Sequence, residues 1–179
     1  EDLAVAVPNR AQLYTSFQDS PEVMVRLVQL AGSAPHLFQK VVRHQEWLET
    51  LFTQNEEEEE RVSLLTELRE RLAGVRKWES KIESLARFHQ REVVRTALHE
   101  IVGEADTPRT LSSLTELAEA VLAVLIEICA EEQITHHKEP EFARRVLERV
   151  AVIGMGKLGG AELGYSSDWD VVFVYENSR

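Results

Sequence analysis

The sequence has little of what disulfide-bonded, membrane-spanning and nucleic-acid-binding proteins need. Its 179 residues include one cysteine, Cys129, which excludes an intramolecular disulfide and a cysteine-rich zinc site. No apolar run approaches the roughly 18 residues that cross a bilayer, and the chain begins without a signal-peptide pattern. A net charge of -11 disfavours nonspecific binding to nucleic acid. We therefore expect a globular protein of a reducing, cytoplasmic compartment that binds neither membrane nor nucleic acid.

Two regions with different hydrophobic periods divide the sequence. Residues 1–148 carry apolar side chains at helical spacing, which predicts a helical domain built as a bundle with short connections. Residues 149–179 contain two short runs rich in β-branched residues, which predict strands. The chain lacks an initiator methionine and stops after the second run, so we expect a fragment whose last domain is truncated. The expected class is mainly α, ending in the first strands of an α+β domain.

The apolar spacing also predicts where the helices lie. Proline at position 21 suits a first helical turn, Gly103 is expected to end the longest helix, and residues 106–108 are expected to form a turn. Cys129 has apolar neighbours in the sequence and is expected in the core. The helices themselves are expected over residues 20–32, 33–43, 62–72, 78–102 and 111–134.

A cluster of basic side chains interrupts the acidic background of the longest helix. Arginines recur there every four residues and therefore share one face of the helix. One interpretation is a solvated stripe paired with Glu83 and Glu92, and the other is a surface for phosphate or an acidic partner. The cluster consists of Arg87, His89, Arg91 and Arg95.

Two further polar segments have a metal-binding alternative that we disfavour. The acidic run Glu56–Glu60 is expected as a solvated loop or a first helical turn, because consecutive residues point around a helix rather than at one ion. His136 and His137 stand near Glu139, but these residues show no periodicity and are expected to form a polar linker.

The segment between the two predicted strands is rich in glycine and ends in two aspartates. Val150–Ile153 is expected as a buried strand and Val171–Tyr175 as the second strand. The glycines of the segment are Gly154, Gly156, Gly159, Gly160 and Gly164, and the acids are Glu162, Asp168 and Asp170.

Two familiar phosphate-binding patterns fit this segment poorly. Gly154, Gly156 and Gly159 match G-x-G-x-x-G, but dinucleotide folds also need an apolar helix and then a strand that ends in one acid. Here a short polar turn follows, and two acids begin the next strand. A P-loop needs Ser or Thr after its lysine, whereas Leu158 follows Lys157.

A metal-dependent nucleotide site fits better. Alternation along a strand puts Asp168 and Asp170 on one face, about 6 to 7 Å apart, with Trp169 on the other. Carboxylates with phosphates and water suit Mg²⁺, and a two-metal site holds both oxygens of an in-line displacement. Glycines let backbone N–H groups approach a triphosphate, and Lys157 adds positive charge. This arrangement is that of a nucleotidyltransferase of the DNA polymerase β type, which needs a further carboxylate on a later strand.

The residues from Gly154 to Asp170 resemble the signature of the glutamine synthetase adenylyltransferase family, a two-headed bacterial enzyme. Each head of this family has a helical domain followed by a nucleotidyltransferase core. The string is Gly-Met-Gly-Lys-Leu-Gly-Gly-Ala-Glu-Leu-Gly-Tyr-Ser-Ser-Asp-Trp-Asp. Residues 32–37, 43–48 and 85–92 are also similar to the family's helical segments, so the resemblance spans about residues 20–176. Two departures are Trp169, where an aliphatic residue is usual, and Gln45, where proline is common.

The resemblance implies an activity, ligands and partners. One head transfers AMP from ATP to a tyrosine of glutamine synthetase, and the other removes it by phosphorolysis, releasing ADP; together they regulate nitrogen assimilation. Asp168 and Asp170 would hold Mg²⁺, and Glu162 would orient the turn. Glutamine synthetase is the expected partner, with a PII-type nitrogen signalling protein as a second. The residues that would hold the nucleotide are Gly154, Gly156, Lys157, Gly159, Gly160 and Ser167.

Two questions stay open at the level of the sequence. Glu162-Leu163-Gly164-Tyr165 resembles the adenylylating head slightly more than the deadenylylating one, and both remain candidates. We expect the chain by itself to be catalytically incomplete, because it ends before the further carboxylate. The alternative function is a helical interaction module that docks glutamine synthetase or a regulator.

Overall fold

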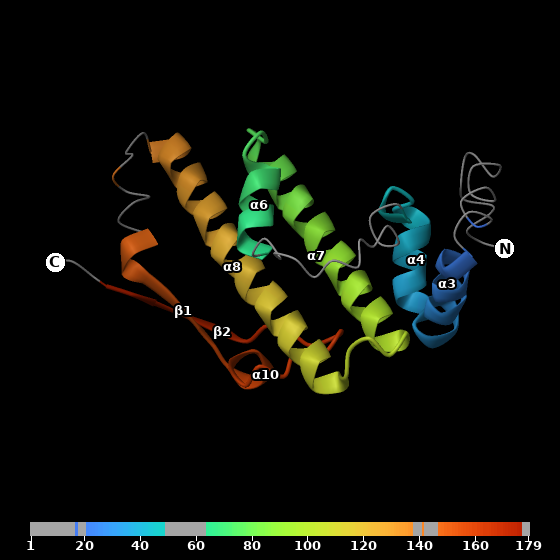
Figure 1. The fold of residues 1–179 in the computed structure, drawn as a ribbon. Coiled ribbons are helices and arrows are strands. Elements are labelled where there is room, and N and C mark those ends of the chain that lie inside the picture. The colour runs from blue at the N-terminus through green and yellow to red at the C-terminus, as the bar shows by residue number, and fades with distance from the viewer. Residues whose placement is uncertain (1–16, 18–20, 49–63, 138–140, 142–146, 177–179) are drawn as a thin grey trace. The chain divides into compact units, whose positions relative to one another are not determined.

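The computed structural model describes residues 17, 21–48, 64–137, 141 and 147–176, which form mainly helices followed by a two-stranded sheet (Figure 1). This agrees with the expected mainly α class. Two compact units divide the chain, one of Glu1–Glu59 with Gln90–Thr107 and the other of Glu60–His89 with Pro108–Arg179. The elements are α3 (Pro21–Ser33), α4 (Pro35–Arg43), α6 (Leu64–Leu72), α7 (Trp78–Ile101), α8 (Thr107–His137), β1 (Val150–Gly154), α10 (Gly156–Gly159) and β2 (Val171–Tyr175).

Helix ends follow the local chemistry of the sequence. Pro21 begins α3 and Pro35 begins α4, because the fixed φ of proline suits a first turn, in which no intrahelical N–H donor is needed. Gly103 adopts a φ of 79°, and the N–H groups of Glu104 and Ala105 both donate to the carbonyl of His99. The predicted end of α7 at Gly103 is therefore confirmed, with a left-handed glycine closing the helix.

Helix α8 is longer than the sequence pattern predicts. The predicted turn at residues 106–108 was placed too far along the chain, because Thr107 already begins the helix and Pro108 fits its first turn. The helix then continues through His136 and His137, where a linker was expected. The side chains of these two histidines, Glu139 and the run Glu56–Glu60 lie outside the described residues.

In the first unit, buried apolar side chains from α3, α4 and the second half of α7 form the core. Leu30 and Val41 are completely buried, and the buried Trp47 ring stacks on the His44 ring with centroids 4.4 Å apart. Arg26 of α3 pairs with Glu104 at 2.8 Å, which ties α3 to the residues after α7. The other core residues of this unit are Leu27, Leu37, Val93, Val94, Ala97 and Leu98.

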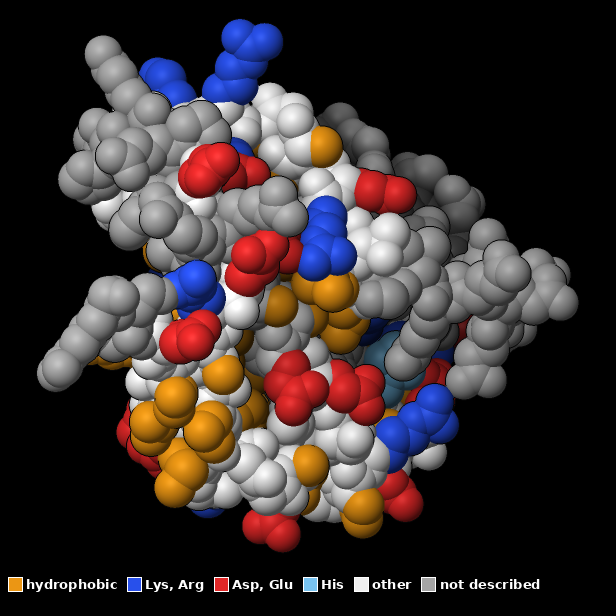
Figure 2. All heavy atoms as spheres, turned by 90° about the vertical axis from the view of Figure 1, so that its left-hand side faces the viewer, with side chains coloured by type: hydrophobic (Ala, Val, Ile, Leu, Met, Phe, Trp, Pro, Cys, Tyr) orange, Lys and Arg blue, Asp and Glu red, His pale blue; other side chains and the backbone are white. Residues whose placement is uncertain are grey.

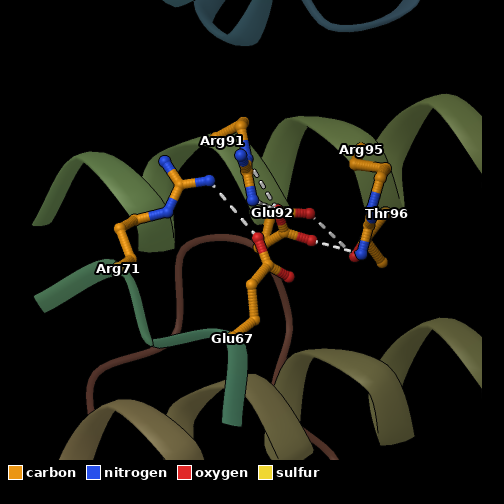
Figure 3. Close-up of polar contacts among 6 residues, drawn as sticks. All are labelled: Glu67, Arg71, Arg91, Glu92, Arg95 and Thr96. Atoms are coloured by element: carbon orange, nitrogen blue, oxygen red, sulfur yellow. Dashed lines mark hydrogen bonds and ion pairs between the residues drawn. The ribbon is translucent and has the colours of Figure 1, made fainter. Parts of the chain in front are cut away.

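The same unit contains a buried charge network on α7, drawn in Figure 3. Glu92 is 3% exposed and receives two bonds from the guanidinium of Arg91, which is 7% exposed, at 2.7 and 2.8 Å. Arg95 pairs with the other oxygen of Glu92 at 2.5 Å. The expectation of a solvated stripe is thus wrong for Arg91, while Arg87 is exposed and His89 turns to another contact described below.

In the second unit, α6 and the first half of α7 lie beside α8 (Figure 1). Arg69 of α6 donates two hydrogen bonds to Glu127 of α8, and this pairing raises the pKa of the Arg69 guanidinium above its ordinary value. Lys81 of α7 forms an ion pair with Glu131 of α8. The apolar side chains buried between these helices are Leu68, Leu72, Leu85, Phe88, Leu114, Leu117, Ala118, Val121, Val124 and Ile128.

The two strands pair antiparallel, with Val152 opposite Phe173 and Gly154 opposite Val171. The prediction of a buried first strand is wrong, because β1 alternates between half-buried and exposed residues, and β2 leaves Phe173 57% exposed. A buried strand must be covered on both faces. Here a hollow of about 310 Å³, lined by Val150, Phe173 and residues of α8, leaves part of the sheet without such cover. Figure 2 shows a cluster of hydrophobic side chains at the surface of the face that it draws.

Cys129 lies at the edge of that hollow and is exposed, so its expected place in the core is wrong. Its neighbours Ile128 and Ala130 are buried, but a single helical step turns the side chain by about 100°. Apolar neighbours in the sequence therefore do not predict burial within a helix.

None of the helices in the described ranges combines the length and the hydropathy of a membrane span.

The charge network on α7 generates a stability prediction. Replacing Glu92 by alanine removes a buried carboxylate that pairs with the guanidinium groups of both Arg91 and Arg95, so we expect a loss of about 3 kcal/mol in the free energy of unfolding. Urea denaturation followed by circular dichroism measures it. Glu131→Ala, which removes an exposed carboxylate paired with Lys81, is the control and should cost less than about 1 kcal/mol. Equal losses in the two variants would contradict a special role for burial.

Candidate functional site

The glycine-rich segment folds into a single helical turn between the two strands. After β1, α10 spans only Gly156–Gly159, and the N–H of Gly160 donates to the carbonyl of Gly156 at 3.0 Å. The N–H of Met155 donates to the carbonyl of Asp170 at 2.8 Å, which extends the pairing of the strands by one residue. The start of the turn and the second aspartate are therefore held side by side.

Three glycines permit this close folding. A Cβ on Gly159 would lie 2.4 Å from the carbonyl oxygen of Gly154, and one on Gly154 would lie 2.9 Å from the side chain of Leu158. Gly156 has a φ of 53°, and its Cβ would lie 2.9 Å from Oδ2 of Asp170. The turn thus packs onto β1, and one aspartate carboxylate reaches the backbone of the turn.

The geometry also decides against a dinucleotide fold. That fold joins parallel strands through a full crossover helix, with the glycine turn at the start of the helix. Here the strands are antiparallel and α10 has four residues. Gly154, Gly156 and Gly159 therefore match G-x-G-x-x-G because they allow a tight turn to pack on β1, and they do not mark a dinucleotide fold.

Asp168 and Asp170 are both exposed, and Trp169 between them is half-buried. The expectation that the aspartates begin the second strand needs a correction of register, because β2 begins at Val171 and both acids precede it. The Trp169 ring meets the ring of His89 on α7 edge to face, with centroids 5.2 Å apart. The Trp169 side chain therefore contacts a neighbouring helix.

Two other predicted site residues lie on the same segment. Lys157 is exposed on α10, and no carboxylate of the described residues forms an ion pair with it. Ser167 Oγ accepts a hydrogen bond from the N–H of Gly164 at 3.0 Å, and the N–H of Ser167 donates to the carbonyl of Gly164 at 3.1 Å. The Ser167 hydroxyl oxygen therefore holds a turn of the loop.

The sequence pattern missed the residues that anchor the loop to the helices. Thr115 of α8 accepts a hydrogen bond from the N–H of Leu163 at 3.4 Å and donates its own proton to the carbonyl of Leu111. Leu158 and Leu163 are buried. Thr115 and His89 lie far from the loop in the sequence, so no local spacing could have identified them.

The donor chemistry of the aspartates suits a hard divalent cation. Mg²⁺ is usually bound by one or two carboxylates and completes its octahedron with water and phosphate oxygens. Asp168 and Asp170 supply two exposed carboxylates, one of them against a glycine backbone without a side chain. Among the residues that the structure describes, no group of three or more His, Cys, Asp and Glu could hold a metal ion. Two carboxylates are a usual protein contribution to a Mg²⁺ site, in which water and phosphate oxygens supply the remaining ligands.

Comparison with known proteins places these observations in a family. The sequence model described as glutamate-ammonia ligase adenylyltransferase matches residues 24–179. Three curated relatives are each called a bifunctional glutamine synthetase adenylyltransferase/adenylyl-removing enzyme. The Pasteurella multocida protein is 31% identical over 90% of this chain, and those of Acinetobacter baylyi and Shewanella loihica are 29% and 30% identical over 97% and 89%. The chain spans only 17%, 20% and 17% of their respective lengths.

The crowded turn generates a second prediction. Gly159→Ala forces its Cβ against the Gly154 carbonyl, so we expect a loss of about 2 kcal/mol or more in stability, because the obstacle is backbone rather than a flexible side chain. Gly160→Ala is the matched control, since its Cβ would meet the nearest atom at 3.4 Å. Thermal unfolding of both variants measures the difference. A Gly159→Ala protein as stable as the control would contradict the packing of the turn on β1.

Proposed function

The chain belongs to the glutamate-ammonia ligase adenylyltransferase family, and from this premise we propose that its glycine turn and two aspartates begin a nucleotidyltransferase site. The proposed reaction transfers AMP between ATP or ADP and a tyrosine hydroxyl of glutamine synthetase. Residues 149–179 would form the start of the catalytic domain, and residues 1–148 a helical domain that precedes it. The observation that carries the proposal is the Asp170 carboxylate lying against the Gly156 backbone, where the turn begins.

Each residue of the site has a proposed task in this reaction. Asp168 and Asp170 would hold Mg²⁺, which supplies positive charge to the phosphate oxygens during phosphoryl-type transfer. The N–H groups of Gly159 and Gly160 already donate to the carbonyls of Met155 and Gly156, so a phosphate would be received by N–H groups at the start of the turn, where Gly156 has no side chain. Lys157 would add a point charge to the same phosphates, and the Ser167 hydroxyl would donate a hydrogen bond. Fixed charges aimed at the transferred group are the main source of rate in such chemistry.

Both directions of the reaction fit this set of residues. In adenylylation, the tyrosine hydroxyl attacks the α-phosphorus of ATP and pyrophosphate leaves. In the reverse-acting head, inorganic phosphate attacks the phosphorus of the AMP–tyrosine bond, and ADP forms while the hydroxyl is regenerated. Glu162 would orient the turn in either case, since its backbone N–H donates to the Lys157 carbonyl at 2.8 Å.

The proposed partner follows from the names of the relatives. Those proteins are described as acting on glutamine synthetase, and we propose the same protein substrate for the enzyme that contains this chain. A PII-type nitrogen signalling protein is proposed as a regulator on the resemblance alone. The site itself needs ATP or ADP and a divalent cation, which makes it directly testable.

A charge-removing substitution tests the proposed site. In the full-length protein, Asp168→Asn and Asp170→Asn should each lower the transfer of labelled AMP to glutamine synthetase by on the order of a hundredfold or more, because an amide cannot replace the charge of a metal-binding carboxylate. Asp106→Asn, at an exposed position before α8, is the control and should keep the activity of the unmodified enzyme. Transfer that survives in both site variants would contradict the proposal and favour a helical interaction module that docks glutamine synthetase.

A further inference from the structure

Trp169 is the residue that separates the two aspartates, and its environment differs from theirs. Both aspartates are exposed, whereas the tryptophan is half-buried against α7. Its ring meets the ring of His89 with centroids 5.2 Å apart and an angle of 87° between the planes, a favourable edge-to-face geometry. This contact joins the aspartate segment to a side chain of the helical region.

The helix that presents His89 is held firmly at that position. The preceding residue, Phe88, is almost fully buried, and the Arg71 guanidinium lies over its ring at 5.6 Å from the centroid. The backbone that carries His89 is therefore anchored by the packing of α6 and α7 within the second unit. A ring carried on an anchored helix can restrict the directions open to the Trp169 side chain.

Fixing Trp169 also fixes its neighbours in the chain. Asp168 and Asp170 precede β2 and are exposed, whereas Trp169 between them is half-buried with its ring on His89 of α7, so the ring and the two carboxylates have different surroundings. The Asp170 carboxylate lies beside Gly156. Because the three residues share one short stretch of backbone, we expect a rotation of the tryptophan toward solvent to move both carboxylates away from the glycine turn.

We propose that His89 is a positioning residue for the Asp168–Asp170 metal site, and that it acts through the ring of Trp169. This inference rests on the proposed function, because it assumes that the two aspartates bind a cation. In this role His89 contacts the ring of Trp169 and does not act as a metal ligand. Its contribution is to hold the carboxylates in the direction that a shared ion requires.

Terbium(III) luminescence tests the proposal in the 179-residue chain. The ion prefers oxygen ligands, as Mg²⁺ does, and emits when an excited tryptophan nearby transfers energy to it. Emission from the unmodified chain should disappear in Trp169→Phe and in the double variant Asp168→Asn/Asp170→Asn. Emission that survives both substitutions, or that never appears, would reject the metal site itself and with it the role of His89.

Substitutions at His89 then test the positioning role separately. His89→Ala should raise the terbium concentration at half-maximal emission roughly three- to tenfold, and His89→Phe should restore it by supplying another ring. His36→Ala, at an exposed position of α4, should leave it unchanged. An unchanged midpoint in His89→Ala, or a His89→Phe protein as weak as the alanine variant, would overturn the proposal while leaving the metal site standing.

Thermal unfolding of the same variants excludes a merely structural explanation. A contact that only stabilises the fold would lower the unfolding temperature in His89→Ala without changing the terbium midpoint measured well below it. If His89→Ala does not fold, His89→Gln removes the ring while keeping a polar side chain of similar reach, and the same midpoint decides. A shifted midpoint in a folded variant supports the proposal.

Discussion

The rest of the site depends on one constraint, which is that positions 154, 156 and 159 must be glycine because there is no room for a side chain. Any Cβ at these positions would collide with the backbone or a neighbouring side chain, and at Gly159 the obstacle is a carbonyl oxygen only 2.4 Å away. The turn can therefore pack directly on β1, and β2, which follows the turn, lies antiparallel beside β1. The Asp170 carboxylate then lies against the Gly156 backbone, in the space that a side chain there would fill.

The helices contribute to this site by holding its loop from the other side. Leu158 and Leu163 are buried, Thr115 of α8 binds the loop backbone, and His89 of α7 meets the Trp169 ring. In the proposed site, these contacts would act together to set the direction in which the acidic side chains face. The helical region of this chain is thus part of the proposed catalytic arrangement as well as a scaffold before it.

Local patterns predicted the helices well because helix ends depend on nearby residues, such as Gly103 closing α7 and Pro21 opening α3. Burial was predicted less well because it depends on what lies across space. Cys129 stands between buried residues but faces outward, and β1 looks buried by composition but is partly exposed. The glycines and the aspartates of the site could be identified from their spacing. The contacts of His89 and Thr115 could not, since their partners lie elsewhere in the sequence.

The central claim is that Asp168 and Asp170 bind a divalent cation beside the glycine turn. A crystal of the protein grown with Mn²⁺ and a non-hydrolysable ATP analogue tests it most directly, because anomalous scattering locates manganese without assumptions about its ligands. The account predicts a manganese peak within coordination distance of both carboxylates and of a phosphate oxygen that rests on the turn. Manganese bound elsewhere, with the two carboxylates turned away from the nucleotide, would contradict it.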